Sequence, residues 1–515
     1  MTESIERGAD RRAIRRQARK RNSIESLPWR VLKNPIPPMQ FLDEGQIQLL
    51  HESSMHIVES IGIDFLDAPT LDLWAAAGAK VDKKAQHVWI DRHLLMDLVR
   101  KAPAQFTLRA RDPAKNIPVG GNNTVFVSTS GTPFVSDYDN GRRPGTLADV
   151  QNMIRLIHQC PPINVVESQV TEPQDIPVMH RHLERGLAIF TLSDKPVAQA
   201  AHGSVVCEDC LNMAAIVFGG HEEIKKQPVF AAIINANSPL RYDTNMAQGL
   251  VSYSRGGQPL VVTPFILAGA MSPITMAAAV AQQNAEALAG IALTQLCNPG
   301  VPVIYGGFTT NIDLATGSPA FGTPEGAWAF FAGAQLARFY GLPYRGSGGL
   351  NTSKVVDAQA AYESQMCLWP TVLSHTNWVQ HAAGWLESGL VCSFEKFIVD
   401  VECVAMMQQL YQPVEISAAT LALDMIKEIG PGGHHFGTSH TLARYQTEFY
   451  RTAVADRLAI GQWTDNGKLD AGQRAHGIWK ELLASYEPPP IDIAIKEELT
   501  DYVGRRRREL PASFV

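Results

Sequence analysis

Polar and aromatic side chains suited to binding a small charged molecule stand at the ends of short apolar runs along the sequence. They comprise Gln169, Glu172, His202, Asn235, Tyr305, Phe308, Arg345, Leu350, Asn351 and His381. The set is rich in amides and aromatic rings, and the sequence contains no G-x-S-x-G motif, the signature of a serine nucleophile. These residues predict a pocket that binds and aligns a substrate.

The chemistry of these residues suits a ligand with charge. Arg345 could hold a carboxylate through two parallel N–H bonds, or it could form a salt bridge at the rim of the fold. Tyr305, Phe308, Trp378 and Trp385 could together surround a cation, although single aromatic residues belong more often to the core. Glu167 and Glu172 could add negative charge, although Glu172 could equally cap the helix that follows it.

A metal site is the competing interpretation. His202, Cys207 and Cys210 place three potential zinc ligands within the segment HGSVVCEDC. Both cysteines fall in a helical pattern, where cysteine usually serves as a small apolar residue, and no second Cys or His pair lies nearby. We therefore predict that the chain holds no metal.

Eight short strand candidates position these residues, and a helical pattern separates each pair. The strands are predicted in TVFVSTSG (from Thr124), NVVESQV (Asn164), KPVAQAAHG (Lys195), VFAAIIN (Val229), PLVVTP (Pro259), VPVIYGG (Val301), LPYRGSGG (Leu342) and NWVQHAAG (Asn377). Two helices carry clear end signals, a Thr146-x-x-Asp149 capping box and a Thr323-Pro324 start with Gly341 at the end.

Eight strand–helix repeats predict parallel strands that close into an α/β fold of the (β/α)8 TIM-barrel type, with the site at the carboxyl ends of the strands. A doubly wound sheet is disfavoured because no G-x-G-x-x-G follows the first strand. We predict a basic arm over residues 1–34, a small α+β cap over 35–121, the barrel over 122–393 and a C-terminal helical region over 394–515.

Composition bounds the class of protein. The chain has 515 residues, 45% of them hydrophobic and 19% charged, with net charge −6 and seven scattered cysteines. These values favour a cytoplasmic globular protein with reduced thiols and give no general attraction to nucleic acid or to membranes. Eight Lys or Arg residues between Arg7 and Arg21 predict a disordered tail or a partner-binding arm, and Arg505–Arg508 form a second basic cluster.

Several segments in this order resemble the trimethylamine methyltransferase family. They are DYDNGRRPGTLADV, TEPQDIP, INANSPLRYD, TPFILAGAMSPITMAAAV, AGWLESGLVCSFEKFIVD and IGPGGHHFGTSHT, and the resemblance runs from about Pro35 to the C-terminal helices. It implies a (β/α)8 barrel that transfers a methyl group from an amine to the cobalt of a corrinoid carried on a separate small protein. The chain itself contains no corrinoid-binding D-x-H-x-x-G motif, so it should bind no cofactor tightly.

The resemblance also assigns the loop after the seventh strand. Archaeal family members carry pyrrolysine there, and Leu350 falls at or next to that position in GGLNTSK. Members without pyrrolysine resemble glycine betaine methyltransferases. Leucine has no electrophilic atom, whereas a quaternary amine already carries its positive charge and needs no adduct before it loses a methyl group.

Three glycines precede Leu350 in that loop, Gly346, Gly348 and Gly349. They could clear side chains from the barrel mouth so that a corrinoid comes close, or they could form a tight turn with positive φ. In the first case we expect Leu350 and Asn351 to face the substrate.

The predicted function is therefore a methyltransferase that moves a methyl group from a quaternary amine, glycine betaine or a relative, to a partner corrinoid protein. We expect a homo-oligomer. A zinc-dependent barrel enzyme and a non-catalytic betaine-binding protein are the alternatives.

Overall fold

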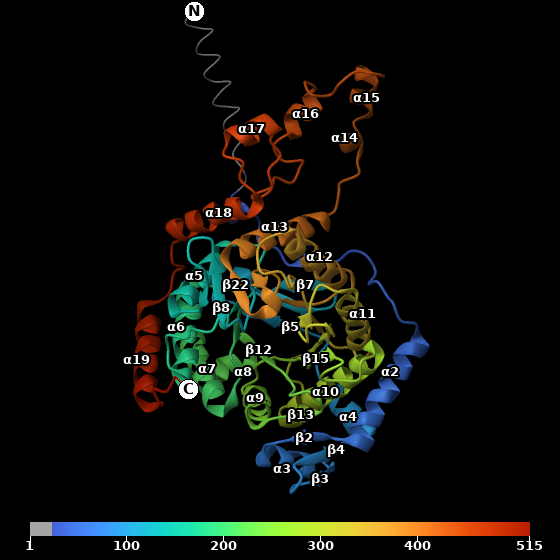
Figure 1. The fold of residues 1–515 in the computed structure, drawn as a ribbon, viewed down its shortest axis with the longest axis vertical. Coiled ribbons are helices and arrows are strands. Elements are labelled where there is room, and N and C mark those ends of the chain that lie inside the picture. The colour runs from blue at the N-terminus through green and yellow to red at the C-terminus, as the bar shows by residue number, and fades with distance from the viewer. Residues whose placement is uncertain (1–22, 515) are drawn as a thin grey trace, which may run out of the picture.

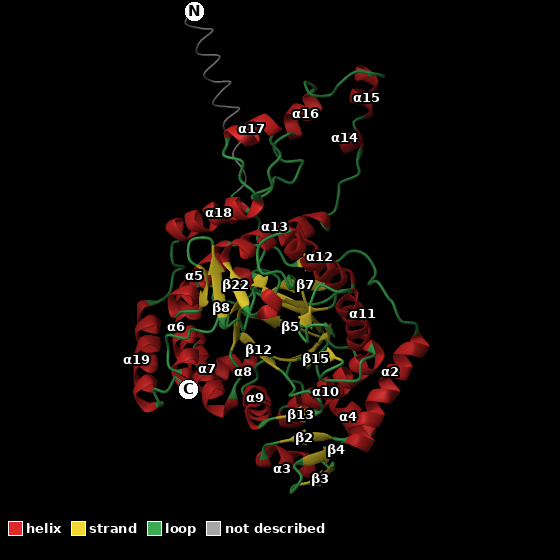
Figure 2. Ribbon diagram, in the orientation of Figure 1, coloured by secondary structure: helices red, strands yellow, loops and turns green. Residues whose placement is uncertain are grey.

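The computed structural model describes residues 23–514, and Figure 1 shows their arrangement. The basic run from Arg7 to Arg21 lies outside the described residues. The core is a curled sheet surrounded by helices, which Figure 2 shows as yellow strands inside a ring of red helices. The expected α/β class is confirmed.

Eight parallel strands form the central part of this sheet, one in each predicted strand region. In chain order they are β7 (Asn123–Phe126), β10 (Val166–Glu167), β11 (Val197–Gln199), β12 (Phe230–Ile234), β14 (Leu260–Val262), β16 (Val303–Gly306), β19 (Tyr344–Ser347) and β20 (Trp378–Gln380). Consecutive strands pair from β10 to β20, and β20 pairs with β7. An isolated parallel bridge between Val127 and Val165 joins the β7 and β10 segments.

A helix follows each of these strands on the outside of the sheet. They are α5 (Leu147–Gln159), α6 (Arg181–Leu192), α7 (Gly203–Phe218), α9 (Thr244–Arg255), α10 (Met276–Cys297), α11 (Pro324–Phe339), α12 (Ala358–Leu373) and α13 (Phe394–Leu410), with the short α8 (His221–Lys226) after α7. The end signals are confirmed, because Thr146 and Asp149 form a capping box and Gly341 adopts φ +71° after α11.

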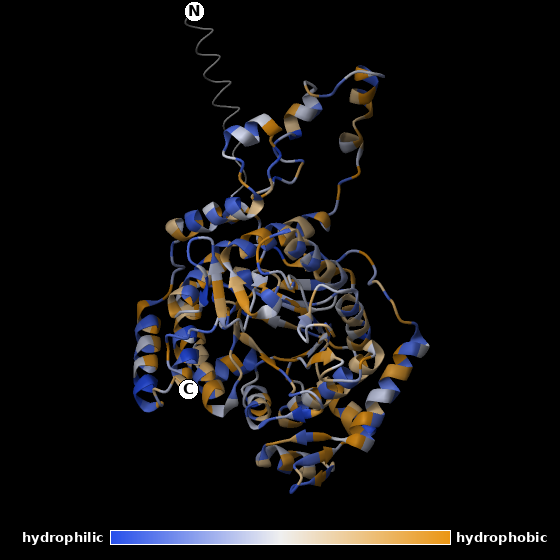
Figure 3. Ribbon diagram, in the orientation of Figure 1, coloured by the Kyte–Doolittle hydropathy of each residue, from blue (hydrophilic) through white to orange (hydrophobic). Residues whose placement is uncertain are grey.

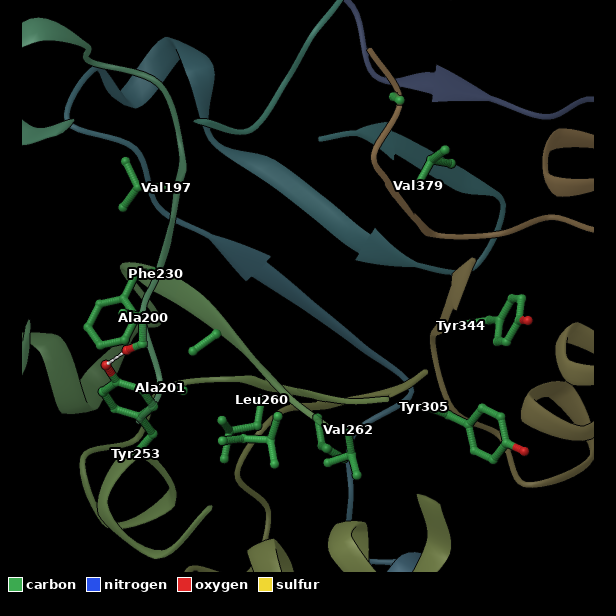
Figure 4. Packing of buried hydrophobic residues seen from close by; sticks show 14 of the residues in the cluster. Val197, Ala200, Ala201, Phe230, Tyr253, Leu260, Val262, Tyr305, Tyr344 and Val379 are labelled. Carbon is green, nitrogen blue, oxygen red and sulfur yellow. Dashed lines mark hydrogen bonds between the residues drawn. The ribbon is translucent and has the colours of Figure 1, made fainter. Parts of the chain in front are cut away.

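The two faces of the sheet bury different partners. Outward side chains pack against the helices, as Phe230, Val262 and Tyr305 do in Figure 4. Inward side chains pack against a hairpin of β5 (Gln105–Leu108) and β6 (Ile117–Gly120). That inner cluster joins Leu108, Ile117 and Val119 of the hairpin to Val125, Val127, Val165, Ala198, Ala231, Val261, Ile304 and Trp378. The hairpin therefore plugs the amino-terminal end of the sheet.

The N-terminal segment makes a small layer beside the sheet. It contains β1 (Leu32–Lys33), α2 (Glu44–His56), β2 (Ile63–Phe65), α3 (Ala68–Ala76), β3 (Lys80–Asp82), β4 (His87–Trp89) and α4 (Arg92–Val99). Its sheet takes a fourth strand, β13 (Arg241–Tyr242), from the segment after β12, and α2 and α4 pack on α10. This layer consequently shares a strand with the main body.

Two further small sheets extend past the carboxyl ends of the parallel strands. One combines β8 (Phe134–Asp137), β9 (Gly141–Pro144), β21 (Trp385–Leu386) and β22 (Val391–Ser393). The other combines β15 (Phe265–Ala268), β17 (Phe308–Ile312) and β18 (Pro319–Ala320). Both lie where the functional side chains were expected, so they shape that end of the sheet.

The C-terminal region is helical, as predicted from its sequence. Four short helices project from the body in Figure 1, namely α14 (Ala418–Leu421), α15 (Leu423–Ile429), α16 (Ser439–Arg444) and α17 (Ile460–Asp465). The chain then returns through α18 (Ala471–Ser485), which packs on α13, and α19 (Ile493–Glu509), which packs on α6 and α7. Arg506 pairs with Asp209 at 2.7 Å, so the second basic cluster helps to attach α19. Within residues 23–514, no helix has the length and apolar character needed to span a bilayer.

Candidate functional site

Arg345 is the central side chain of the site, at the end of β19. It lies in register with Trp378 of β20, whose ring belongs to the inner cluster, so the arginine also points to the inner face. Its side chain is 2% exposed and donates from Nη1 to the Gly307 carbonyl at 3.0 Å. Burial lowers its pKa to about 9. Among the described residues, no carboxylate pairs with it.

His381 lies beside Arg345 at the end of β20. Its backbone φ is +55°, a left-handed conformation that is costly for a residue with a Cβ and that concentrates at functional positions. Burial, and then the charge of Arg345, hold the pKa of its imidazole well below the usual value. His381 is therefore neutral and can offer a hydrogen bond or packing surface without adding a second positive charge.

An aromatic cluster encloses the same space. The Phe308 ring centroid lies 4.8 Å from the guanidinium carbon of Arg345 and 5.7 Å from the His381 ring. Trp385 stacks obliquely on His381 at 4.3 Å, and Phe265 contacts Phe308 at 5.0 Å. Aromatic faces attract cations, and a dry pocket strengthens that attraction.

Leu350 packs into this aromatic cluster from the β19–α12 loop. It is 1% exposed and contacts the group that includes Phe321, Phe330, Cys367 and Trp385. Asn351 next to it donates from Nδ2 to the Trp385 carbonyl at 2.6 Å. Both residues thus lie at the predicted site, with Leu350 serving as apolar wall.

A buried carboxyl stands on the opposite side of the inner face. Gln380 donates from Nε2 to Glu167 Oε2 at 3.3 Å and to Ser130 Oγ at 3.1 Å, and it accepts from Trp378 Nε1 at 2.8 Å. Burial raises the pKa of the Glu167 carboxyl to about 7. Near neutral pH this group can therefore supply a negative charge inside the sheet.

Several buried polar atoms at the ends of β19 and β20 have no hydrogen-bond partner in the structure. They are Arg345 Nε, Ser347 Oγ, Asn351 Oδ1, His381 Nδ1 and Trp385 Nε1. Buried polar atoms are nearly always satisfied in folded proteins, and leaving one unpaired costs about 1–3 kcal/mol. These atoms leave several donors and acceptors available to a polar ligand at this end of the sheet.

A buried ion pair supports the two loops that carry these atoms. Lys396 of α13 contacts Asp400 and donates to Ser364 Oγ at 3.0 Å, and Ser364 in turn donates to the Gly349 carbonyl at 3.0 Å. Asp400 accepts from the Gly384 amide at 2.9 Å. The pair therefore connects the loop after β19 with the loop after β20.

Tyr305 does not join the site, which corrects the prediction. Its hydroxyl donates to Asn284 Oδ1 of α10 at 3.0 Å, and its ring faces Tyr340 and Tyr344 in the layer between sheet and helices. The neighbouring Ile304 takes the inward position. Alternate residues of a strand point to opposite faces, so the tyrosine lies on the outer one.

The remaining predicted residues, Gln169, Glu172, His202 and Asn235, follow the carboxyl ends of β10, β11 and β12. Glu172 pairs with Arg185 at 2.7 Å and accepts from Gln169 Nε2 at 3.4 Å, a local ion-pair network. His202 and Asn235 are exposed at the ends of β11 and β12. None of these four makes a contact with Arg345 or His381 in the structure.

The three loop glycines face the protein interior and do not clear space at the open end. A Cβ at Gly346 would lie 3.2 Å from Thr376 Oγ1, and one at Gly348 would lie 2.9 Å from Val379 Cγ1. None of the three has a left-handed φ. Close packing of β19 against β20 therefore explains them, and both earlier interpretations of these glycines are wrong.

The zinc alternative finds no geometric support. Cys207 and Cys210 are buried in α7, and burial raises the pKa of each thiol to about 12. His202 is exposed. Across the part of the chain that the structure describes, no group of three or more His, Cys, Asp or Glu residues is arranged to hold a metal ion.

Sequence reasoning left several residues out of the candidate set. Glu167 and Trp385 were considered, as a negative charge and as a cation contact, but were not selected, and Gln380 and Phe265 were not considered. All four line the inner face or the aromatic cluster. The strand period offers a signal for two of them, because Gln380 and Glu167 each stand two residues after an inward apolar residue, Trp378 and Val165. Phe265 belongs to β15, an extension that the sequence pattern did not predict.

Comparison with known proteins gives a consistent result. A family profile described as trimethylamine methyltransferase (MTTB) matches residues 7–511. A glycine betaine methyltransferase of Desulfitobacterium hafniense (strain Y51) is 40% identical over 475 residues, 92% of this chain and 98% of that protein. Trimethylamine methyltransferase MttB of Desulfitobacterium hafniense (strain DSM 10664 / DCB-2) is 30% identical over 470 residues, 91% and 94% of the two chains.

Among solved structures, the monomethylamine methyltransferase MtmB of Methanosarcina barkeri aligns with a TM-score of 0.45 and 9% identity. That alignment covers 90% of this chain and 91% of the other.

Proposed function

The chain belongs to the trimethylamine methyltransferase family, and from that membership we propose that it demethylates a quaternary amine, glycine betaine or a close relative. The methyl group goes to Co(I) of a corrinoid carried by a separate small protein. We also propose that the curled sheet is a complete (β/α)8 barrel, because its eight parallel strands pair in sequence and the Val127–Val165 bridge links the two ends.

The observation that carries this proposal is the buried, unpaired guanidinium of Arg345. An arginine out of water is costly unless an anion binds it, and Arg345 Nε has no acceptor within the described protein. A betaine supplies the missing carboxylate and carries a permanent cation at its other end. Phe265, Phe308 and Trp385 offer aromatic surface for that cation, and Glu167 offers negative charge.

The Leu350 loop favours a quaternary substrate over trimethylamine. Nothing in the aromatic cluster around Leu350 can form a covalent adduct with a tertiary amine. A quaternary ammonium needs no such activation, since it departs as a neutral tertiary amine. The protein then has to fix the N–CH3 bond in line with the acceptor and exclude water, which a buried aromatic pocket does.

The acceptor has to approach from the carboxyl ends of the strands. The β5–β6 hairpin fills the amino-terminal end, whereas His202 and Asn235 remain exposed at the other end. That open end fits the approach of a large planar cofactor on a docked protein. When bound, the corrinoid would supply a nucleophilic cobalt, and Arg345, Glu167 and the aromatic side chains would hold the amine.

The test is a substrate screen with the cognate corrinoid protein in its Co(I) state. We expect dimethylglycine to form from glycine betaine only when the corrinoid protein is present, and trimethylamine to remain intact. Consumption of trimethylamine without that of any betaine would contradict the assignment of the Leu350 loop. Betaine binding without transfer would identify a binding protein, and stoichiometric zinc with loss of activity on chelation would identify a zinc enzyme.

A further inference from the structure

An arm of residues 412–470 projects from the body between α13 and α18 (Figure 1). Its four helices have four to seven residues each and none contains a buried residue. Helices this short are not stable in water without packing. The arm nevertheless presents large apolar side chains that are 67–85% exposed: Val414, Ile416, Leu423, Phe436, Phe449 and Ile460. Figure 3 shows orange, hydrophobic stretches of ribbon along the arm.

The base of the arm is firmly attached to the body. Buried Glu402 of α13 accepts from the Tyr450 hydroxyl at 2.9 Å and from the Ala453 amide at 2.9 Å. Arg30 donates to Gln409 Oε1 at 3.0 Å, just before the arm begins. The arm is thus a fixed projection, and an apolar projection of this size is typical of a protein–protein contact.

An apolar groove runs beside the foot of the arm. On α12, Tyr362, Met366 and Trp369 follow each other at helical spacing, and all three are exposed. Leu373 and Leu410 continue this surface and line a groove of about 880 Å³. The chain therefore carries both an apolar projection and an apolar groove, and neither is covered by the rest of the described residues.

We propose that two copies of this chain exchange arms, so that the arm of each packs into the α12–α13 groove of the other. A projection and a groove on one surface make a self-complementary, two-fold contact. The groove begins at the foot of the arm, where Leu410 and Pro413 line it, and the arm extends away from the body in Figure 1.

The position of the arm favours a second copy over the corrinoid protein. Gln408, next to the foot, donates to the carbonyl of Pro162, which precedes β10, so the groove and the start of the arm lie at the amino-terminal end of the parallel strands. That end is opposite the open end of the sheet. The arm returns to the body at α18, where His476 pairs with Asp139 of the β8–β9 hairpin. At roughly 100–150 Å² for each exposed side chain, two arms bury on the order of 2,000 Å² in all, the range of stable dimers.

The experiment measures the mass of the full chain in solution by sedimentation equilibrium. We expect a dimer for the natural protein. The double variant Phe436→Asp with Phe449→Asp changes the arm, and Met366→Asp with Trp369→Asp changes the groove. Each pair should raise the dimer dissociation constant at least a hundredfold, because every change is repeated at two symmetric contacts. Leu314→Asp, equally exposed on the β17–β18 loop, is the matched control and should remain a dimer.

Mixing the two variants tests reciprocity. One intact contact of the two remains in a mixed dimer, so the mixture should associate more tightly than either variant alone and more weakly than the natural chain. Circular dichroism checks that each variant is folded. A monomeric natural chain, or arm and groove variants that stay dimeric, would overturn the proposal, and so would a mixture that does not associate.

Discussion

The guanidinium carbon of Arg345 lies 4.8 Å from the centroid of the Phe308 ring, with Nε facing no acceptor. One face of the cation is thus held by an aromatic ring while its donor edge stays available. The same Phe308 ring contacts Trp385 and Phe265, the side chains proposed to receive the ammonium group of a betaine.

Arg345→Gln removes the cation proposed to bind the carboxylate and leaves a shorter, neutral polar side chain. A charge-assisted hydrogen bond contributes about 1.5–3 kcal/mol, so the KM for glycine betaine should rise about tenfold or more. Any turnover of choline, which has no carboxylate, should keep its KM. Arg100→Gln, an exposed control on α4, should change neither value. An equal loss for both amines would contradict the role of Arg345.

Trp385→Leu should weaken binding of every quaternary amine alike, because the cation is common to all of them. Loss of one cation–π contact of about 0.5–2 kcal/mol corresponds to a roughly twofold to thirtyfold rise in KM. Tyr305→Phe is the matched aromatic control, since its hydroxyl contacts Asn284 outside the site. The Tyr305→Phe variant should have a lower melting temperature and an unchanged KM. A rise in its KM would indicate that Tyr305 belongs to the substrate site.

Glu167→Gln should raise stability above pH 7 and not at pH 5. The folded-state pKa is about 7, whereas the ordinary value is 4.5, so between these pH values the folded chain holds a proton that the unfolded chain has released. The free energy of unfolding consequently falls as pH rises from 4.5 to 7.

Glutamine cannot ionise, so at pH 8 the variant should gain up to about 3 kcal/mol over the natural chain, measured by urea unfolding. Glu481→Gln, an exposed control, should show no such dependence on pH. The same difference at pH 5 and pH 8 would mean that Glu167 titrates as an ordinary carboxyl.

Lys396→Met should destabilise the protein by about 3–5 kcal/mol, because Asp400 is left as a buried charge without its cation. Burial already raises the pKa of the Asp400 carboxyl. The double variant Lys396→Met with Asp400→Asn should lose less than the sum of the two single variants in urea unfolding. Simple additivity would show that the two side chains are not coupled.

The sequence predicted the positions of the strands and helices better than it predicted which side chains of each strand point inward. Each of the eight predicted strand regions contains a parallel strand, and the Thr146–Asp149 box caps its helix. Parallel strands covered on both sides are apolar throughout, so their pattern does not reveal which residues point inward. That is why Tyr305 was assigned to the site and Glu167 was not selected.

Other parts of the site depend on contacts between distant segments. The aromatic cluster joins Phe265 and Phe308, on the paired strands β15 and β17 of one small sheet, to Trp385 on β21 of the other. The glycines before Leu350 meet Thr376 and Val379 of the neighbouring segment. Local sequence patterns carry no information on contacts between such distant segments, because tertiary packing alone determines them.

In the described part of the chain the β5–β6 hairpin fills the amino-terminal end of the inner face, so in the proposed reaction the amine and the corrinoid protein both approach from the carboxyl ends of the strands. A corrinoid protein docked at the carboxyl end blocks entry of the amine, so the amine has to bind first. The demethylated product then leaves only after the corrinoid protein dissociates. A large excess of the corrinoid protein should then slow turnover, because it occupies enzyme that is still empty and forms a dead-end complex.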